Sequence, residues 1–126
     1  MSAPASSCNI LIVEDQEGPR EALAAILRPH YRICTAETAK AALRIVQDQH
    51  VDLVIEDIGL PDRNGIDLLR DIKSIRDLKV IVMSGAGTLQ SANEAMNLGA
   101  VAYLLKPFNV KELLELVHQA LYLRAA

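Results

Sequence analysis

A regular alternation of short apolar runs and longer amphipathic segments constrains the fold of this chain most strongly. Five apolar runs predict strands, which end at Val13, Thr35, Glu56, Met83 and Leu105, with separations of 22, 21, 27 and 22 residues. Between the runs, apolar residues recur three and four positions apart, which is typical of helices. Strand, helix and strand repeated at this spacing form right-handed parallel units. The sequence therefore predicts an α/β fold with a doubly wound, five-stranded parallel sheet.

Capping residues and apolar spacing predict where the individual elements lie. The strands are expected to begin at Asn9, Tyr31, Leu53, Lys79 and Val101. Amphipathic helices are expected at about 17–28, 39–46, 66–75, 89–96 and 110–121. Asn64, Thr88 and Asn109 are predicted N-caps, and Gly99 is predicted to end the fourth helix.

Length and composition restrict the class of protein. The 126 residues suffice for one domain, 9–123, after a disordered leader at 1–8. A net charge of −3 argues against direct nucleic-acid binding, which requires a basic field. Neither a signal peptide nor an apolar run of the roughly 20 residues that span a membrane is visible, so a cytoplasmic protein without membrane contact is expected. Cys8 and Cys34 lack the spacing of a metal site and are expected to be small buried thiols in a reducing compartment.

Four of the five predicted strands end in a reactive polar group. Glu14 and Asp15 follow the first strand, Asp57 the third, Ser84 the fourth and Lys106 the fifth. The carboxyl ends of parallel strands share one edge of the sheet, where open α/β sheets bind their ligands. In the flavodoxin-like (βα)5 strand order 2-1-3-4-5, the switch point between the first and third strands brings the three carboxylates together.

The charges of these groups predict a divalent metal and phosphoryl transfer. Three carboxylates and one ammonium leave a net charge near −2, which is costly unless a cation lies among them. Mg²⁺ suits few oxygen ligands, because it keeps several waters and also binds phosphoryl oxygens. Asp57 would then be the nucleophile and form an acyl phosphate. Lys106 and the Ser84 hydroxyl would stabilise charge on the transferring group.

Each residue also has an ordinary structural explanation. Glu14 and Asp15 could simply cap the first helix. Ser84 could be a turn hydroxyl, and Lys106 an exposed lysine. Their joint placement at one sheet edge favours the site over these explanations.

The same residues match a known pattern. The matching segments are Ile12-Val13-Glu14-Asp15, Asp57 with Pro61 and Gly65, Ser84-Gly85, and Gly99-Ala100 followed by Tyr103-Leu104-Leu105-Lys106-Pro107-Phe108. With them, the chain resembles bacterial response-regulator receiver domains over residues 9–121. Gly87-Thr88-Leu89-Gln90 and Leu98-Gly99-Ala100 further resemble receivers fused to ATPase-type transcriptional activators.

The resemblance implies a signalling switch that is not an enzyme beyond its own phosphorylation and dephosphorylation. Asp57 would accept phosphate from a sensor histidine kinase. The implied Mg²⁺ ligands are Glu14, Asp15, Asp57 and the backbone carbonyl of Gly59. Lys106 would contact the phosphate, and Ser84 with Tyr103 would form the switch pair. The output would pass through residues 88–121 to an effector or a second copy of the chain.

Some positions depart from the commoner pattern of that family. Ser84 replaces threonine but keeps the hydroxyl. Glu56 stands where an apolar or small residue is expected and should project to the opposite side from Asp57. Gly59 and Ala86 place no long side chain over the phosphate, which would leave it open to water.

Three other functions stay open. A haloacid-dehalogenase-type phosphohydrolase uses a similar aspartate nucleophile, but it carries Asp-x-Asp where this chain has Glu14-Asp15-Gln16. A flavodoxin-like cofactor binder would need a hydroxyl-rich phosphate loop, and only four aromatic residues are present to stack a flavin. A receiver-like adaptor that never takes phosphate usually lacks the acceptor or the lysine, and both are present here.

Overall fold

The structure is a computed structural model in which residues 8–122 are described. Five strands form one parallel sheet in the order β2-β1-β3-β4-β5, which confirms the expected fold class. The strands are β1 (Cys8–Val13), β2 (Ile33–Ala36), β3 (Val51–Asp57), β4 (Lys79–Ser84) and β5 (Ala102–Leu105). The helices are α1 (Glu17–Leu27), α2 (Ala39–Asp48), α3 (Gly65–Ile75), α4 (Leu89–Asn97) and α5 (Val110–Tyr122).

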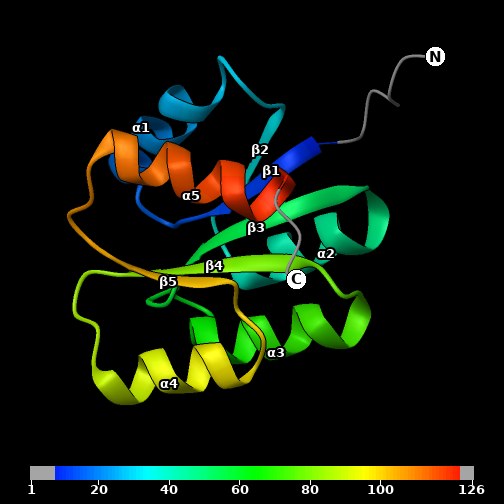
Figure 1. The fold of residues 1–126 in the computed structure, drawn as a ribbon. Coiled ribbons are helices and arrows are strands. Elements are labelled where there is room, and N and C mark those ends of the chain that lie inside the picture. Colours follow the sequence, from blue (N-terminus) through cyan, green and yellow to red (C-terminus); the bar gives the residue numbers. More distant parts are fainter. Residues whose placement is uncertain (1–7, 123–126) are drawn as a thin grey trace.

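The sheet is the middle of three layers (Figure 1). Helices α1 and α5 cover one face, and α2, α3 and α4 cover the other. Alternate residues of each strand supply the two cores, so Ile10 and Ile12 belong to the α1–α5 side, whereas Leu11 and Val13 belong to the opposite side. Since both faces are covered, the central strands are largely apolar and the reactive polar groups lie mainly at their ends. Among the helices of residues 8–122, none has the length and apolar content needed to cross a membrane.

The predicted capping residues are confirmed. Asn64 accepts a hydrogen bond from the N–H of Ile66 at 2.7 Å, and Asn109 accepts one from the N–H of Glu112 at 2.6 Å. Thr88 and the third residue of α4 cap each other reciprocally. Gly99 has φ +98°, a left-handed conformation that ends α4 and that side chains rarely adopt.

Several strand limits differ from the prediction by one or two residues. Tyr31 lies in the turn that follows α1, where its N–H donates to the carbonyl of Leu27 at 3.0 Å, so β2 begins only at Ile33. Asp57 is the last residue of β3 and not the first residue after it, because it still pairs with Met83 of β4. The residue that carries the Asp57 carboxylate therefore belongs to the sheet itself.

The prediction for the amino-terminal cysteine is also wrong. Cys8 is the first residue of β1 and is buried, whereas the remainder of the expected leader, 1–7, lies outside the described residues. Cys8 and Cys34 form a disulfide, with Cα atoms 6.1 Å apart, so they are not free thiols. Their separation of 26 positions in sequence conceals this proximity, which results from the pairing of β1 with β2.

The start of α3 packs closely on the end of β3 and places the loop beside Asp57. The N–H of Gly65 donates to the carbonyl of Ile58 at 2.8 Å. A Cβ at Gly65 would lie 2.5 Å from the Cα of Ile58 and 2.9 Å from the carbonyl oxygen of Asp57. Only glycine fits this approach, so Gly65 shapes the loop that carries Gly59.

Candidate functional site

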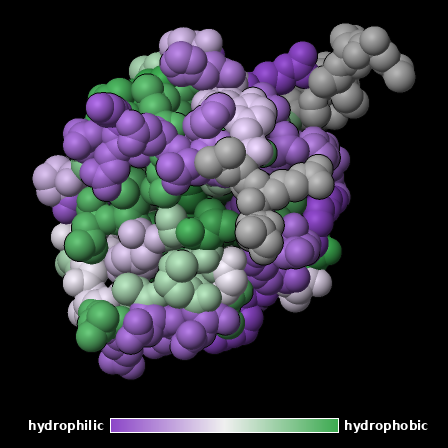
Figure 2. Space-filling model, in the orientation of Figure 1, coloured by the Kyte–Doolittle hydropathy of each residue, from purple (hydrophilic) through white to green (hydrophobic). Residues whose placement is uncertain are grey.

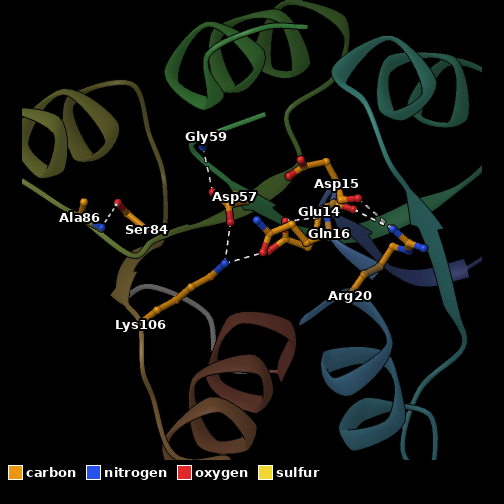
Figure 3. Close-up of polar contacts among 9 residues, drawn as sticks. All are labelled: Glu14, Asp15, Gln16, Arg20, Asp57, Gly59, Ser84, Ala86 and Lys106. Atoms are coloured by element: carbon orange, nitrogen blue, oxygen red, sulfur yellow. Dashed lines mark hydrogen bonds and ion pairs between the residues drawn. The ribbon is translucent and has the colours of Figure 1, made fainter. Parts of the chain in front are cut away.

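The carboxylate of Asp57 is held through both of its oxygens at the carboxyl edge of the sheet (Figure 3). Oδ1 accepts a hydrogen bond from the N–H of Gly59 at 2.8 Å, and Oδ2 lies 2.5 Å from Nζ of Lys106. The side chain is 14% exposed. The carboxylate is therefore fixed in orientation and still reachable from solvent.

Lys106 links Asp57 to Glu14, which follows β1. Its Nζ donates to Oε1 of Glu14 at 2.8 Å, and Oε2 of Glu14 accepts from the N–H of Gln16 at 3.2 Å. Glu14 is buried. The backbone N–H of Lys106 donates to the carbonyl of Ser84 at 2.8 Å. The ends of β1, β3 and β5 thus meet around one ammonium group, and the backbone bond to Ser84 places the end of β4 beside β5.

Burial and charge move the pKa values of these groups in different directions. Burial is the main cause that raises the pKa of Glu14, and the neighbouring Asp57 adds to it. Burial also acts to raise the pKa of Asp57, but hydrogen bonds from Lys106 and Gly59 outweigh it and lower the value. Burial acts to lower the pKa of Lys106, whereas its bonds to Asp57 and Glu14 outweigh this and raise it. Asp57 is therefore ionised at neutral pH beside a charged lysine.

The oxygen groups at this edge fit a hydrated Mg²⁺ ion. Asp15 is exposed and directly follows Glu14, and Gly59 lies two residues after Asp57. Within residues 8–122, no three His, Cys, Asp or Glu side chains already converge as metal ligands. Mg²⁺ needs only one or two carboxylates, because waters complete its shell. Burial is the main cause of the raised pKa of Glu14, and the smaller part that comes from Asp57 is a repulsion between carboxylates that a bound cation would relieve.

The two predicted switch residues, Ser84 at the end of β4 and Tyr103 in β5, form hydrogen bonds outside the group of Glu14, Asp57 and Lys106. The buried hydroxyl of Ser84 accepts from the N–H of Ala86 at 3.2 Å. The hydroxyl of Tyr103 lies 2.8 Å from Oγ of Ser91 in α4. Gly87 leaves room for this ring, since a Cβ there would be 2.8 Å from the Tyr103 hydroxyl. The ring of Tyr103 is thus held by α4.

The sequence patterns do not single out Arg20, which contacts the backbone of Glu14 and Asp15, or Ser91, which contacts Tyr103. Arg20 is buried, and its Nη1 lies 3.3 and 3.4 Å from the carbonyl oxygens of Glu14 and Asp15. A signal for Arg20 exists, because it lies seven positions before Leu27 on the buried stripe of α1. Ser91 has no comparable signal, since its partner lies 12 residues away in another element.

Comparison with known proteins places most of the chain in one family. Residues 10–118 match the model described as response regulator receiver domain. The chain is 42% identical over 118 residues to the DNA-binding transcriptional regulator NtrC of Azospirillum brasilense, covering 92% of this chain and 24% of that protein. It is 35% identical over 118 residues to sporulation initiation phosphotransferase F of Bacillus subtilis, covering 92% and 95%. The chain thus spans about a quarter of the NtrC relatives it matches.

Solved structures have the same fold. The beryllofluoride-activated NtrC4 receiver domain dimer is 31% identical, with a TM-score of 0.86 and coverage of 90% of this chain and 95% of that one. A response regulator from Burkholderia pseudomallei, described with a phosphorylated aspartic acid, a calcium ion and citrate, is 26% identical. Its TM-score is 0.79, with coverage of 91% of this chain and 66% of that one.

Proposed function

The chain belongs to the response regulator receiver domain family, and we propose that it is a cytoplasmic switch in which Asp57 accepts a phosphoryl group from a sensor histidine kinase. The observation that carries the proposal is the 2.5 Å contact between the Asp57 carboxylate and Lys106, at the carboxyl end of the central strand. A nucleophile and a cation are thereby placed where a phosphoryl group can enter.

The residues around Asp57 support each part of the transfer. The lowered pKa of Asp57 keeps its carboxylate ionised, so that an oxygen can attack phosphorus. A bond forms between that oxygen and phosphorus while the bond to the donor's leaving group breaks, and the leaving group keeps the electron pair. Lys106 stabilises the charge on the phosphoryl oxygens. Ser84 accepts from Ala86 and so keeps its own hydroxyl proton to donate to one of these oxygens.

Mg²⁺ is the cofactor that this edge would take. The residues that would hold it are Glu14, Asp15, Asp57 and the carbonyl of Gly59. When bound, the ion supplies positive charge that neutralises the transferring phosphoryl group. Each oxygen of Glu14 already accepts one hydrogen bond, from Lys106 or from the N–H of Gln16, and Glu14 would contact the ion through water.

The kinase would approach over the strand ends next to α1. A cavity of about 300 Å³ opens there, with Glu14 and Lys106 at its polar end and Leu23, Ile26 and Phe108 on its apolar walls. Apolar walls beside the reacting carboxylate suit a side chain of the phosphodonor protein.

Phosphorylation would change the surface of α4, β5 and α5. Large hydrophobic side chains are exposed there, namely Leu89, Met96, Val101, Leu105 and Val110. In Figure 2, hydrophobic residues gather on this face between α5 and α4. Exposed apolar patches of this kind are typical of interaction surfaces. The chain would bind an effector domain or a second copy through this face, and the NtrC4 relative is a dimer in its activated form.

Intact-mass analysis after incubation with acetyl phosphate tests the proposal. One phosphoryl group should be added with Mg²⁺ present and none with EDTA. Asp57→Asn should stay unlabelled, and Asp67→Asn, an exposed aspartate of α3, should label like the wild type. Labelling of Asp57→Asn would show that another residue accepts the phosphoryl group, and no labelling of the wild type would favour the adaptor that never accepts phosphate.

A further inference from the structure

Arg20 is a buried cation in the first part of α1. It is 8% exposed. The amino-terminal end of a helix carries partial positive charge and disfavours a cation. A guanidinium is rarely buried unless it is paired, so its partners should explain why it lies there.

Those partners belong to the turn that carries two of the proposed Mg²⁺ ligands. Nη1 donates to the carbonyl oxygens of Glu14 at 3.3 Å and of Asp15 at 3.4 Å. Figure 3 shows the guanidinium reaching from α1 to the backbone of these two residues. Nη2 lies 3.3 Å from a carboxylate oxygen of Glu37, which follows β2. Arg20 therefore ties two loops at the carboxyl edge together.

The direction of the Asp15 side chain depends on this turn. Among the described residues, none forms a hydrogen bond with the Asp15 carboxylate, which is exposed. Its backbone is fixed by Arg20 on one side, and by the N–H of Gln16 bonded to Glu14 on the other. Because the side chain leaves from that backbone, holding the carbonyl restricts the region that the carboxylate can reach as it changes rotamer.

We infer that Arg20 is a positioning residue for the divalent cation: it holds the Glu14–Asp15 turn so that the carboxylates are already oriented when the metal arrives. The inference rests on the proposed function, because it concerns the same metal site. The proposed role and the charge of Arg20 have opposite effects on Mg²⁺ affinity. A cation near the site repels Mg²⁺, so removing Arg20 should tighten metal binding if its charge were its only influence.

Calorimetric titration of the full chain with Mg²⁺ separates these explanations. Arg20→Met keeps the apolar stem and removes the guanidinium. It is expected to weaken Mg²⁺ binding about 10-fold, the usual lower bound for losing a group that orients a metal ligand. Arg20→Lys keeps the charge but lacks the planar guanidinium that reaches the two carbonyls and Glu37 at once, so it should also bind Mg²⁺ more weakly than the wild type. Arg28→Met removes an exposed arginine at the other end of α1, which shares the partner Glu21, and should bind Mg²⁺ like the wild type.

A second readout distinguishes positioning from a general loss of structure. In acetyl phosphate labelling, Arg20→Lys should need more Mg²⁺ for half-maximal rate but reach the wild-type plateau at saturating Mg²⁺. A lower melting temperature with an unchanged Mg²⁺ affinity would overturn the inference, and so would tighter binding by Arg20→Met. If Arg20→Met fails to fold, unchanged affinity of Arg20→Lys overturns it. Failure of the wild type to bind Mg²⁺ would instead overturn the proposed function itself.

Discussion

The hydroxyl of Tyr103 in β5 lies 2.8 Å from Oγ of Ser91, in the first turn of α4. Ser91 also accepts from the N–H of Thr88 at 3.2 Å, while Thr88 accepts from the N–H of Ser91 at 3.0 Å. One serine therefore both caps α4 and holds the ring of the predicted switch residue. The position of the Tyr103 ring and the stability of α4 are consequently linked through a single side chain.

Ser91→Ala should make the activated state easier to reach. The hydrogen bond to Tyr103 stabilises the ring position seen without phosphate, and a typical hydrogen bond contributes about 1 kcal/mol, or roughly fivefold in an equilibrium. Beryllofluoride, a mimic of the phosphoryl group, should therefore bind Ser91→Ala up to about fivefold more tightly in the presence of Mg²⁺. Ser74→Ala, which removes a hydroxyl bonded within α3, is the matched control. Equal or weaker binding by Ser91→Ala would mean that this bond does not restrain the switch.

Lys106→Met should lose phosphorylation-dependent signalling and also lose stability. The sequence places Lys106 at a strand end and predicts only a small stability cost, but the structure shows it bonded to the buried Glu14. Removing the ammonium leaves Oε1 of Glu14 without a partner, which costs about 1–3 kcal/mol. Chemical denaturation in EDTA at pH 7 measures this loss, with the exposed Lys111→Met as the control.

The pH dependence of this loss has a definite sign. Burial raises the pKa of Glu14 above 4.5, and loss of Lys106 removes the contact that lowers it. A raised pKa in the folded state gives stability that is present in acid and lost as pH rises above the unfolded value. The difference between Lys106→Met and wild type should therefore shrink towards pH 4. A difference that is constant with pH would contradict this account of Glu14.

Glu56→Gln should flatten the dependence of stability on pH. Glu56 is fully buried in β3, and neither carboxylate oxygen has a hydrogen-bond partner among the described residues. Burial, with the charge of Asp57 adding to it, raises the pKa of Glu56 well above 4.5. Wild-type stability should thus fall as pH rises above 4.5, by at most about 1.4 kcal/mol per pH unit for one proton.

The test is denaturation in EDTA at several pH values between 4 and 8. Glu56→Gln carries no titrating group at this position. Its free energy of unfolding should therefore increase relative to that of the wild type as pH rises. Glu115→Gln, on the exposed side of α5, should follow the wild type. Parallel curves for Glu56→Gln and wild type would show that Glu56 finds a partner in solution.

The parts of the fold that could be predicted depend on local patterns. Helix caps such as Asn64 bond within three residues, and apolar runs place the strand limits to within two residues, so both are visible in the sequence. The meeting of Asp57 with Lys106 could also be predicted, because parallel topology alone brings the carboxyl ends of strands to one edge.

The remainder depends on tertiary contacts that no local pattern contains. The disulfide of Cys8 with Cys34 depends on strand pairing across 26 residues. Glu56 alternates with Asp57 along β3, so its direction could be predicted, but its lack of a partner could not. The contact of Arg20 with two backbone carbonyls requires the helix to be docked at its observed angle.

The lifetime of the acyl phosphate should depend on what stands above Asp57. Gly59 has no side chain, and Ala86 is exposed with its N–H bonded to Ser84 at 3.2 Å, so both leave the phosphate accessible to water. Ala86→Arg places a long side chain at this position without removing that N–H. It should slow hydrolysis several-fold, because the side chain excludes the attacking water. Ala86→Ser, which adds little bulk, is the control, and phosphate loss is followed by intact mass after removal of acetyl phosphate. An unchanged or shorter lifetime in Ala86→Arg would mean that water reaches phosphorus from another side.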